Sequence, residues 1–172
     1  GEGGGGGGGG VRVVEDVVGF GQREARLGNL ALVAFKGTVD GTDTVFDTTY
    51  GGLPARTNNG QVTVKPAPLA PRVVALNDSP VPGVPAGLLR GITGMRVGGK
   101  RTFVVPPELG FGPDPVGAPF GDVPGNAYLR YDVELLRLSA SGPDRLMRGI
   151  SKCGTGGAAP QYEGCADIVP EE

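Results

Sequence analysis

Along most of the chain, hydrophobic and polar residues alternate in a way that predicts strands more often than helices. Segments 11–18 (VRVVEDVV) and 30–39 (LALVAFKGTV) are rich in β-branched and aromatic residues, and they run into glycine or Asp-Gly turn sequences. In 127–138 (AYLRYDVELLRL), apolar residues alternate with charged ones, which is the period-two pattern of a sheet with one buried face. A similar alternation occurs in 100–105 (KRTFVV). We therefore expect several antiparallel strands.

One short helix is predicted in the same part of the chain, over about residues 85–93. Its apolar face would be formed by Leu88, Leu89 and Ile92, which lie at helical spacing. A proline at the start and a glycine after the end are typical helix boundaries. Several antiparallel strands with one short helix lying across them make an α+β arrangement.

Composition divides the chain into three parts. Its 172 residues can hold one domain with a core of its own, with about thirty to fifty residues left for tails. The 34 glycines are unevenly placed, and residues 1–10 (GEGGGGGGGG) have almost no side chain to bury. We expect a flexible glycine linker or an unassigned segment at 1–10, a domain at 11–139 and a tail at 140–172. The chain opens without Met or a signal-like apolar core, which indicates that any targeting segment has been removed or is not included in this sequence.

Charge and residue types exclude several kinds of function. The 16 basic and 18 acidic residues give a net charge of −2, without the basic stripe that nucleic acid or an anionic membrane surface requires. No apolar run reaches the roughly 20 residues of a membrane-spanning helix. The chain has no histidine, so it lacks the imidazole base of Ser-His-Asp and Cys-His sites and a common zinc ligand. We expect no metal and no cofactor.

The glycine pair before the second alternating segment does not form a phosphate-binding loop. Gly98-Gly99-Lys100 is followed by Arg101, where a P-loop requires Ser or Thr. Lys100 and Arg101 are instead expected at a solvated strand edge, where charges discourage aggregation.

Four segments, in a fixed order, resemble the FKBP-type peptidyl-prolyl isomerases. They are 33–48 (VAFKGTVDGTDTVFDT), 83–95 (GVPAGLLRGITGM), 97–112 (VGGKRTFVVPPELGFG) and 127–138, and together they cover most of 17–138. Each one alone is a weak signal, whereas the ordered set is specific. The resemblance implies an α+β fold in which a twisted antiparallel sheet of five or six strands wraps around one short helix, with a ligand pocket between them.

The resemblance also implies rotation of X-Pro peptide bonds and assigns roles to residues. The catalytic residues would be Asp47, Phe46, Phe35, Phe111 and Tyr131, and the substrate-binding residues would be Val84, Pro85, Leu88 and Val123, with 113–126 as a flap. Rotation faces a barrier of about 20 kcal/mol because the twisted state loses amide resonance, and it needs no proton transfer. A dry aromatic cup would favour the twisted amide. From the alternation alone, the same aromatic residues would be ordinary core.

Several positions depart from the family's pocket. The floor is usually a tryptophan at the helix start, and the matched residue here is Leu88. Phe35 and Phe111 match two wall tyrosines, so two hydroxyls are absent. Pro85 occupies the position whose backbone N–H donates to a bound macrolide or substrate carbonyl, and proline has no N–H. Because each such hydrogen bond contributes about 1 kcal/mol, we expect weak isomerase activity and poor macrolide binding.

Residues 50–71 (YGGLPARTNNGQVTVKPAPLAP) are longer than the bulge that usually follows the Phe-Asp pair in this family. Asn59-Gly60 favours a small hairpin, with QVTV as an added strand. The insertion is either a tolerated surface loop or a docking loop. Within it, Arg56 is a candidate partner for the carboxylate of Asp47.

The tail holds both cysteines of the chain. Residues 144–150 (DRLMRGI) predict about two helical turns. Cys153 and Cys165 enclose a glycine-rich loop that can bend, so they can form a disulfide, which would imply an oxidising compartment. A free pair would indicate redox regulation, and metal binding is the least favoured reading. A cysteine pair that follows such a domain resembles certain immunophilins of the chloroplast thylakoid lumen.

Three kinds of function remain open from the sequence. The first is a weakly active isomerase or folding factor, the second is a non-catalytic binding or assembly subunit of a larger complex, and the third is a thiol-regulated adaptor. In each case the expected partner is a proline-containing client protein or a complex subunit. Docking would use 50–71 and 140–172.

Overall fold

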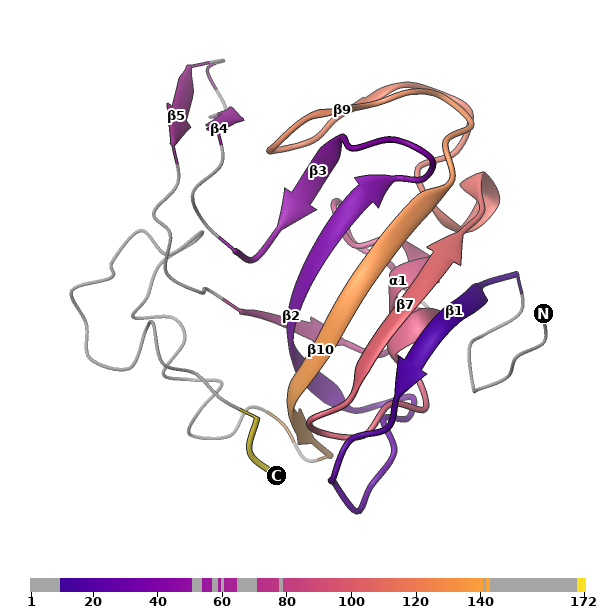
Figure 1. Ribbon diagram of the computed structural model, residues 1–172, viewed down its shortest axis with the longest axis vertical. Helices are drawn as coiled ribbons and strands as arrows, with labels where there is room; N and C mark the ends of the chain where they lie inside the picture. The colour runs from indigo at the N-terminus through magenta and orange to yellow at the C-terminus, as the bar shows by residue number, and fades with distance from the viewer. Residues whose placement is uncertain are drawn as a thin grey trace.

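The described part of the protein consists mainly of strands, with one short α-helix (Figure 1). The computed structural model describes residues 10–50, 54–56, 59, 61–64, 71–77, 79–140, 142 and 170–172. In chain order the elements are β1 (Arg12–Val17), β2 (Leu30–Val39), β3 (Val45–Thr48), β4 (Pro54–Arg56), β5 (Val62–Val64), β6 (Arg72–Ala75), α1 (Ala86–Ile92), β7 (Lys100–Val105), the 3-10 helix η1 (Pro107–Leu109), β8 (Val116–Gly117), β9 (Asp122–Val123) and β10 (Leu129–Ser139).

Six strands form one antiparallel sheet. Its order is β1-β7-β10-β2-β3, and β6 also pairs with β2. The two strands β3 and β6 share one edge of β2, since β6 pairs with Leu30–Val33 and β3 with Lys36–Thr38. The predicted α+β fold, with a sheet of five or six strands and one short helix, is therefore confirmed. Strand β2 has the bounds expected from its sequence.

The main core lies between α1 and the sheet. The helix residues Leu88, Leu89 and Ile92 are all buried, as their spacing predicts. Two glycines on α1 allow a close approach to β7, because a Cβ at Gly87 would lie 2.2 Å from Val105 and one at Gly91 would lie 2.2 Å from Phe103. In Figure 1 the helix crosses behind β7 and β10. Helix and sheet thus pack backbone against side chain, and a larger residue at either glycine would force them apart.

Arg101 differs from its expected place at a solvated edge, and that prediction was wrong. Its side chain is only 3% exposed, and its Nε lies 3.1 Å from Oδ1 of Asp16 on β1. Its Nη1 donates to the backbone carbonyls of Gly91 and Thr93, at 3.0 Å each. The physical reason is the alternation itself, because Arg101 shares the helix-facing side of β7 with Phe103 and Val105. Carbonyls at the end of a helix lack intrahelical donors, and this guanidinium supplies one.

On the other face of the sheet, a smaller apolar cluster is formed by Leu32, Ala34 and Leu136, with Leu30 and Val73 against it. Leu136 lies at a bulge, since the register of β10 with β2 shifts between Leu135 and Arg137. A bulge leaves one residue of the strand without a ladder partner.

The insertion contains the small hairpin expected from its sequence. β4 and β5 pair antiparallel, with Pro54 opposite Val64 and Arg56 opposite Val62. The side-chain oxygen of Asn59 accepts from the backbone N–H of Gln61 at 3.3 Å. The predicted helix at 144–150, Cys153, Cys165 and residues 1–9 lie outside the described residues.

We expect Arg101→Met to lower the free energy of unfolding by about 3 kcal/mol, because it leaves the Asp16 carboxylate and two helix-end carbonyls without their donor. Urea denaturation followed by circular dichroism measures the change. Lys100→Met is the matched control, since the neighbouring Lys100 side chain is exposed, and it should change stability by no more than about 0.5 kcal/mol. Equal losses in the two variants would contradict the role assigned to Arg101.

Candidate active site

Four aromatic rings from different parts of the chain meet on the helix side of the sheet. Phe46 contacts Phe111 and Tyr131 edge-on, with ring centroids 5.7 Å apart in both pairs. Phe35 and Tyr131 are 5.9 Å apart, also edge-on. Gly37 makes room for this arrangement, because a Cβ there would lie 2.7 Å from the tip of the Phe46 ring. Edge-to-face contacts add stability beyond the area they bury and fix the orientation of the rings.

Asp47 lies beside the rings and forms a two-point ion pair with Arg72. The Arg72 Nη1 to Oδ2 distance is 2.9 Å, and the Nη2 to Oδ1 distance is 3.2 Å. The Asp47 side chain is 7% exposed and that of Arg72 is 34% exposed. The guanidinium carbon of Arg72 also lies 4.9 Å from the centre of the Phe35 ring, a cation–π contact. Arg72 therefore contacts both the Asp47 carboxylate and the Phe35 ring and holds them together.

Sequence reasoning missed Arg72 as the partner of Asp47. Its candidate was Arg56, whose side chain lies outside the described residues. The available signal was that Arg72 opens a short β-branched run, which pairs with β2 so that Arg72 is opposite Val33. This register places Arg72 near Phe35, two residues further along β2. The insertion between Asp47 and Arg72 hid their proximity, because chain separation does not measure distance in an antiparallel sheet.

Two threonines after Asp47 fix that segment against β2. The backbone N–H of Phe35 donates to Oγ1 of Thr49 at 2.9 Å, and the N–H of Thr49 donates to the Phe35 carbonyl at 2.9 Å. Oγ1 of Thr48 donates to the same carbonyl at 3.1 Å. All these groups are buried, so the segment has little freedom to move Asp47 away from the cup.

The residues expected to bind substrate lie around the start of α1, except Val123, which lies on β9. Leu88 and Val123 are fully buried in the same core cluster as the rings, and Val84 packs against it. Pro85 immediately precedes α1, and its carbonyl accepts from the N–H of Leu88 at 3.0 Å. The sequence-predicted set is thus brought to one region, with Leu88 and Val123 buried and Val84 and Phe111 half-buried.

The expected flap is a short hairpin made by β8 and β9. The two strands pair with Val116 opposite Val123. The backbone N–H of Phe120 at its tip donates to the carbonyl of Phe46 at 3.0 Å. This hydrogen bond ties the flap directly to the strand that carries Phe46 and Asp47.

Electrostatics keep the Tyr131 hydroxyl neutral. Burial raises the pKa of Tyr131 far above its ordinary value, and the negative charge of Asp47 raises it further, while the positive charge of Arg72 opposes this shift. The site therefore combines apolar rings, one neutral hydroxyl and one ion pair. Such a set suits a reaction governed by shape and desolvation rather than by proton transfer.

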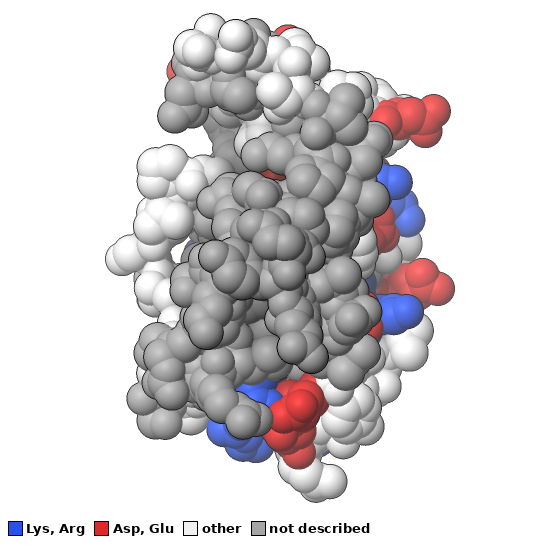
Figure 2. Space-filling model, turned by 90° about the vertical axis from the view of Figure 1, so that its left-hand side faces the viewer, with Lys and Arg blue, Asp and Glu red and all other residues white. Residues whose placement is uncertain are grey.

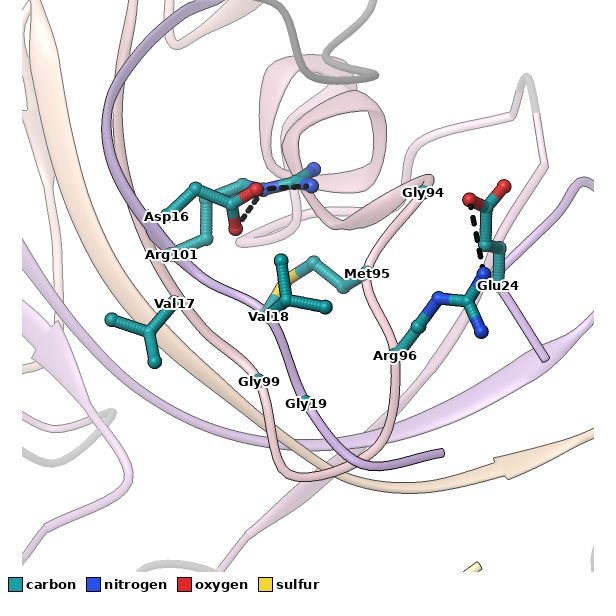
Figure 3. A pocket seen from close by; sticks show the side chains of 10 residues that line it. All are labelled: Asp16, Val17, Val18, Gly19, Glu24, Gly94, Met95, Arg96, Gly99 and Arg101. Atoms are coloured by element: carbon teal, nitrogen blue, oxygen red, sulfur yellow. Dashed lines mark hydrogen bonds and ion pairs between the residues drawn. The ribbon is translucent and has the colours of Figure 1, made fainter. Parts of the chain in front are cut away.

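A separate cavity of about 300 Å³ lies near the end of α1 that Arg101 caps (Figure 3). Its wall carries two ion pairs, Asp16 with Arg101 and Glu24 with Arg96, the latter at 3.7 Å. Each of its four charged residues thus already has a partner of opposite charge. The aromatic cup is the better candidate for a functional site.

Surface and metal chemistry add no competing site in the described part of the chain. Within it, no group of three His, Cys, Asp or Glu side chains is placed to hold a metal ion. Across residues 10–140, apart from the gaps given above, no helix is both long and apolar enough to cross a membrane. On the face shown in Figure 2, acidic and basic side chains lie next to one another rather than in a field of one sign.

The described residues form an antiparallel sheet that covers one short helix, with a cluster of aromatic rings packed on the helix side. Residues 21–136 match the family model described as FKBP-type peptidyl-prolyl cis-trans isomerase. The chain belongs to this family.

Known relatives and one solved structure agree with this membership. The chain is 34% identical over 131 residues to "Peptidyl-prolyl cis-trans isomerase FKBP17-2, chloroplastic" of Arabidopsis thaliana, which covers 75% of this chain and 48% of the relative. It is 45% identical over 60 residues to "Photosynthetic NDH subunit of lumenal location 4, chloroplastic" of the same plant, covering 33% of this chain and 28% of the relative. FkpA from Escherichia coli has a similar structure, with a TM-score of 0.50, 30% identity and coverage of 77% of this chain and 48% of that one. The chain thus spans half or less of the length of these proteins.

The neutral state of Tyr131 predicts a loss of stability at high pH. Below about pH 10, the ordinary pKa of tyrosine, both folded and unfolded protein keep the proton, so its contribution is constant. Above that value the unfolded state releases a proton that the folded state retains, because the folded pKa of Tyr131 is raised, and stability falls with pH.

We therefore expect the wild-type protein to lose about 1.4 kcal/mol per pH unit above pH 10 relative to Tyr131→Phe. Urea denaturation of both proteins from pH 8 to 11 measures this difference. Tyr128→Phe, which changes an exposed tyrosine, is the control. A constant difference between wild type and Tyr131→Phe across this range would refute the assignment.

Proposed function

We propose that residues 11–139 form a catalytic domain that isomerises X-Pro peptide bonds in proline-containing protein clients, at a reduced rate. The observation that carries this proposal is the aromatic cup of Phe35, Phe46, Phe111 and Tyr131 beside the Asp47–Arg72 ion pair. Membership of the family supports it, since members are named for this reaction.

The cup suits amide rotation for a physical reason. The planar X-Pro amide is stabilised by charge separation between oxygen and nitrogen, and the twisted transition state has less of it. An apolar site therefore disfavours the planar form more than the twisted form. Phe46 and Tyr131 are only 1% exposed, so in this proposal the proline ring reaches the ring cluster at the half-buried Phe111, and the flanking carbonyls turn toward polar groups beside it. Asp47 acts through its fixed charge beside the rings rather than by proton transfer.

The reduced rate follows from the groups that are missing. Leu88 replaces the indole floor, so the pocket has less aromatic surface and no indole N–H. Phe35 and Phe111 lack the hydroxyls of the family's tyrosines. Pro85 has no backbone N–H to donate to a substrate carbonyl. Since each lost hydrogen bond corresponds to about 1 kcal/mol, together they amount to a few orders of magnitude in transition-state binding.

A second candidate is an assembly subunit of a larger complex. One relative is named as a photosynthetic NDH subunit of lumenal location. The incomplete pocket fits a domain retained for binding, with 50–71 and 140–172 as docking segments. Both relatives reported above are named as chloroplastic, which supports an organellar location. Within the chloroplast, the thylakoid lumen is the compartment that we propose. In that compartment Cys153 and Cys165 would form a disulfide or act as a redox-sensitive pair, the basis of the thiol-regulated alternative.

The first test is the cis-to-trans rate of a Leu-Pro or Phe-Pro test peptide. We expect catalysis above background, and Asp47→Asn should reduce it at least about tenfold by removing the fixed charge beside the cup. Asp43→Asn is the matched control, because Asp43 is an exposed acid in the turn before the same strand, and it should leave the rate unchanged. A wild-type rate equal to buffer would reject the enzyme and favour the assembly subunit.

The missing hydroxyls give a gain-of-function test. Phe111→Tyr should raise the rate about fivefold, because the added hydroxyl can donate to a substrate carbonyl at a contribution of about 1 kcal/mol. Phe111 is half-buried, so the hydroxyl can be accommodated at the rim. Phe120→Tyr, a half-buried ring on the flap, is the control and should have no effect. If Phe111→Tyr leaves the rate unchanged, the lost hydroxyls do not explain weak catalysis.

A further inference from the structure

Residues Pro170–Glu172 lie against the far end of β10, a place that the isomerase reaction does not use. The backbone N–H of Glu171 donates to the carbonyl of Leu136 at 2.9 Å. Leu136 is the residue at the bulge of β10, where the register with β2 shifts. The bulge therefore leaves the carbonyl of Leu136 available to accept a hydrogen bond from this segment, as it would from an added strand.

Arg137 adds a charged contact to the same segment. Its Nη1 lies 3.2 Å from the backbone carbonyl of Glu171 and 3.2 Å from the side-chain Oε1 of Glu171. The side chain of Arg137 is 19% exposed, whereas that of Glu171 is 62% exposed. The fold thus holds the partly buried guanidinium of Arg137 in place, whereas the carboxylate of Glu171 lies mainly in solvent.

The neighbouring Glu172 is bound by backbone N–H groups of the loop 21–23. Its Oε2 accepts from Gln22 at 2.6 Å and from Arg23 at the longer distance of 3.5 Å. Gly21 allows the approach, because a Cβ there would lie 2.8 Å from the same oxygen. Successive N–H groups that converge on one oxygen form an anion-binding concavity.

The rest of the protein holds this loop in shape. The N–H of Gly21 donates to the carbonyl of Val97 at 3.1 Å. The Arg96 guanidinium donates to the carbonyls of Gly21 and Gln22, at 3.1 and 2.9 Å. The Arg23 guanidinium donates to the carbonyl of Leu138 on β10 at 3.1 Å. These bonds join the loop to β10 and to the turn before β7, so they do not depend on the acidic segment.

We propose that the loop 21–23 and the bulge of β10 form a binding site for an acidic peptide segment, with Glu171 and Glu172 as its ligand within the same chain. The site recognises two consecutive carboxylates, one at Arg137 and one at the N–H groups of Gln22 and Arg23. Residues 143–169, which contain both cysteines, therefore connect two anchored points, the end of β10 and the bound acids.

The first experiment compares the full chain with the double variant Glu171→Ala/Glu172→Ala by NMR. Because a charge-assisted hydrogen bond is lost, we expect the amide proton of Gln22 to shift upfield, and the amide at position 171 should exchange about tenfold faster. Both acids are exposed, so the variant should fold. Glu108→Ala, which removes an exposed acid elsewhere, should change neither signal. Unchanged Gln22 and residue 171 amides in the double variant would overturn the proposal.

The second experiment asks whether the site binds the acidic sequence in trans. The probe is the amidated peptide VPEE, with VPQQ as its uncharged control. In the double variant, VPEE at millimolar concentration should return the Gln22 signal toward its wild-type position, and VPQQ should not. In the wild-type protein the tethered acids already occupy the site at a millimolar effective concentration, so VPEE should leave the Gln22 signal unchanged. In the double variant, equal responses to the two peptides, or none at saturating VPEE, would overturn recognition of carboxylates.

Discussion

The buried guanidinium of Arg101 links the parts of the structure on which the aromatic cup depends. A seven-residue helix is too short to be stable alone, so α1 needs tertiary contacts to form. Two of its glycines let it approach β7, and Arg101 on that strand binds both the carbonyls at the helix end and the carboxylate of Asp16 on β1. Edge strand, inner strand and helix are thereby fixed together. Helix α1 packs against the aromatic rings, so its position beside them depends on these contacts of Arg101.

A second arginine–carboxylate pair, Arg72 with Asp47, joins two strands at the opposite edge of the sheet. Strands β3 and β6 lie along the same edge of β2, and the insertion separates them in sequence. Asp47 comes from β3 and Arg72 from β6, so their ion pair joins the two across this break. The hairpin β4–β5 belongs to the insertion, and in Figure 1 it lies beyond β3, outside this edge of the sheet.

Rotation of an amide bond requires little of a protein beyond a complementary shape, exclusion of water and a few fixed dipoles. This explains how the chain can belong to the family although several residues differ from the pocket that the resemblance implies. The structure brings the rings and the ion pair together, whereas Leu88, Phe35 and Phe111 stand where the family resemblance implies an indole and two tyrosine hydroxyls. The acidic segment contacts Leu136 and Arg137 on β10 and the loop 21–23, and none of these contacts involves the rings or the Asp47–Arg72 ion pair. It binds through backbone groups and an arginine that the cup does not use, so catalysis and tail anchoring can vary independently.

The sequence by itself determined the strands, the short helix and the ordered family segments, because alternation and helical spacing are local properties that survive folding. It also identified Phe35, Phe46, Phe111 and Tyr131 as residues that the fold would bring together. It did not identify Arg72 as the partner of Asp47, Arg101 as a buried cap, or loop 21–23 as a carboxylate site. Each of these depends on strand register or on backbone groups that meet across the sheet. Only the tertiary structure decides which residues distant in sequence form an ion pair or a hydrogen bond.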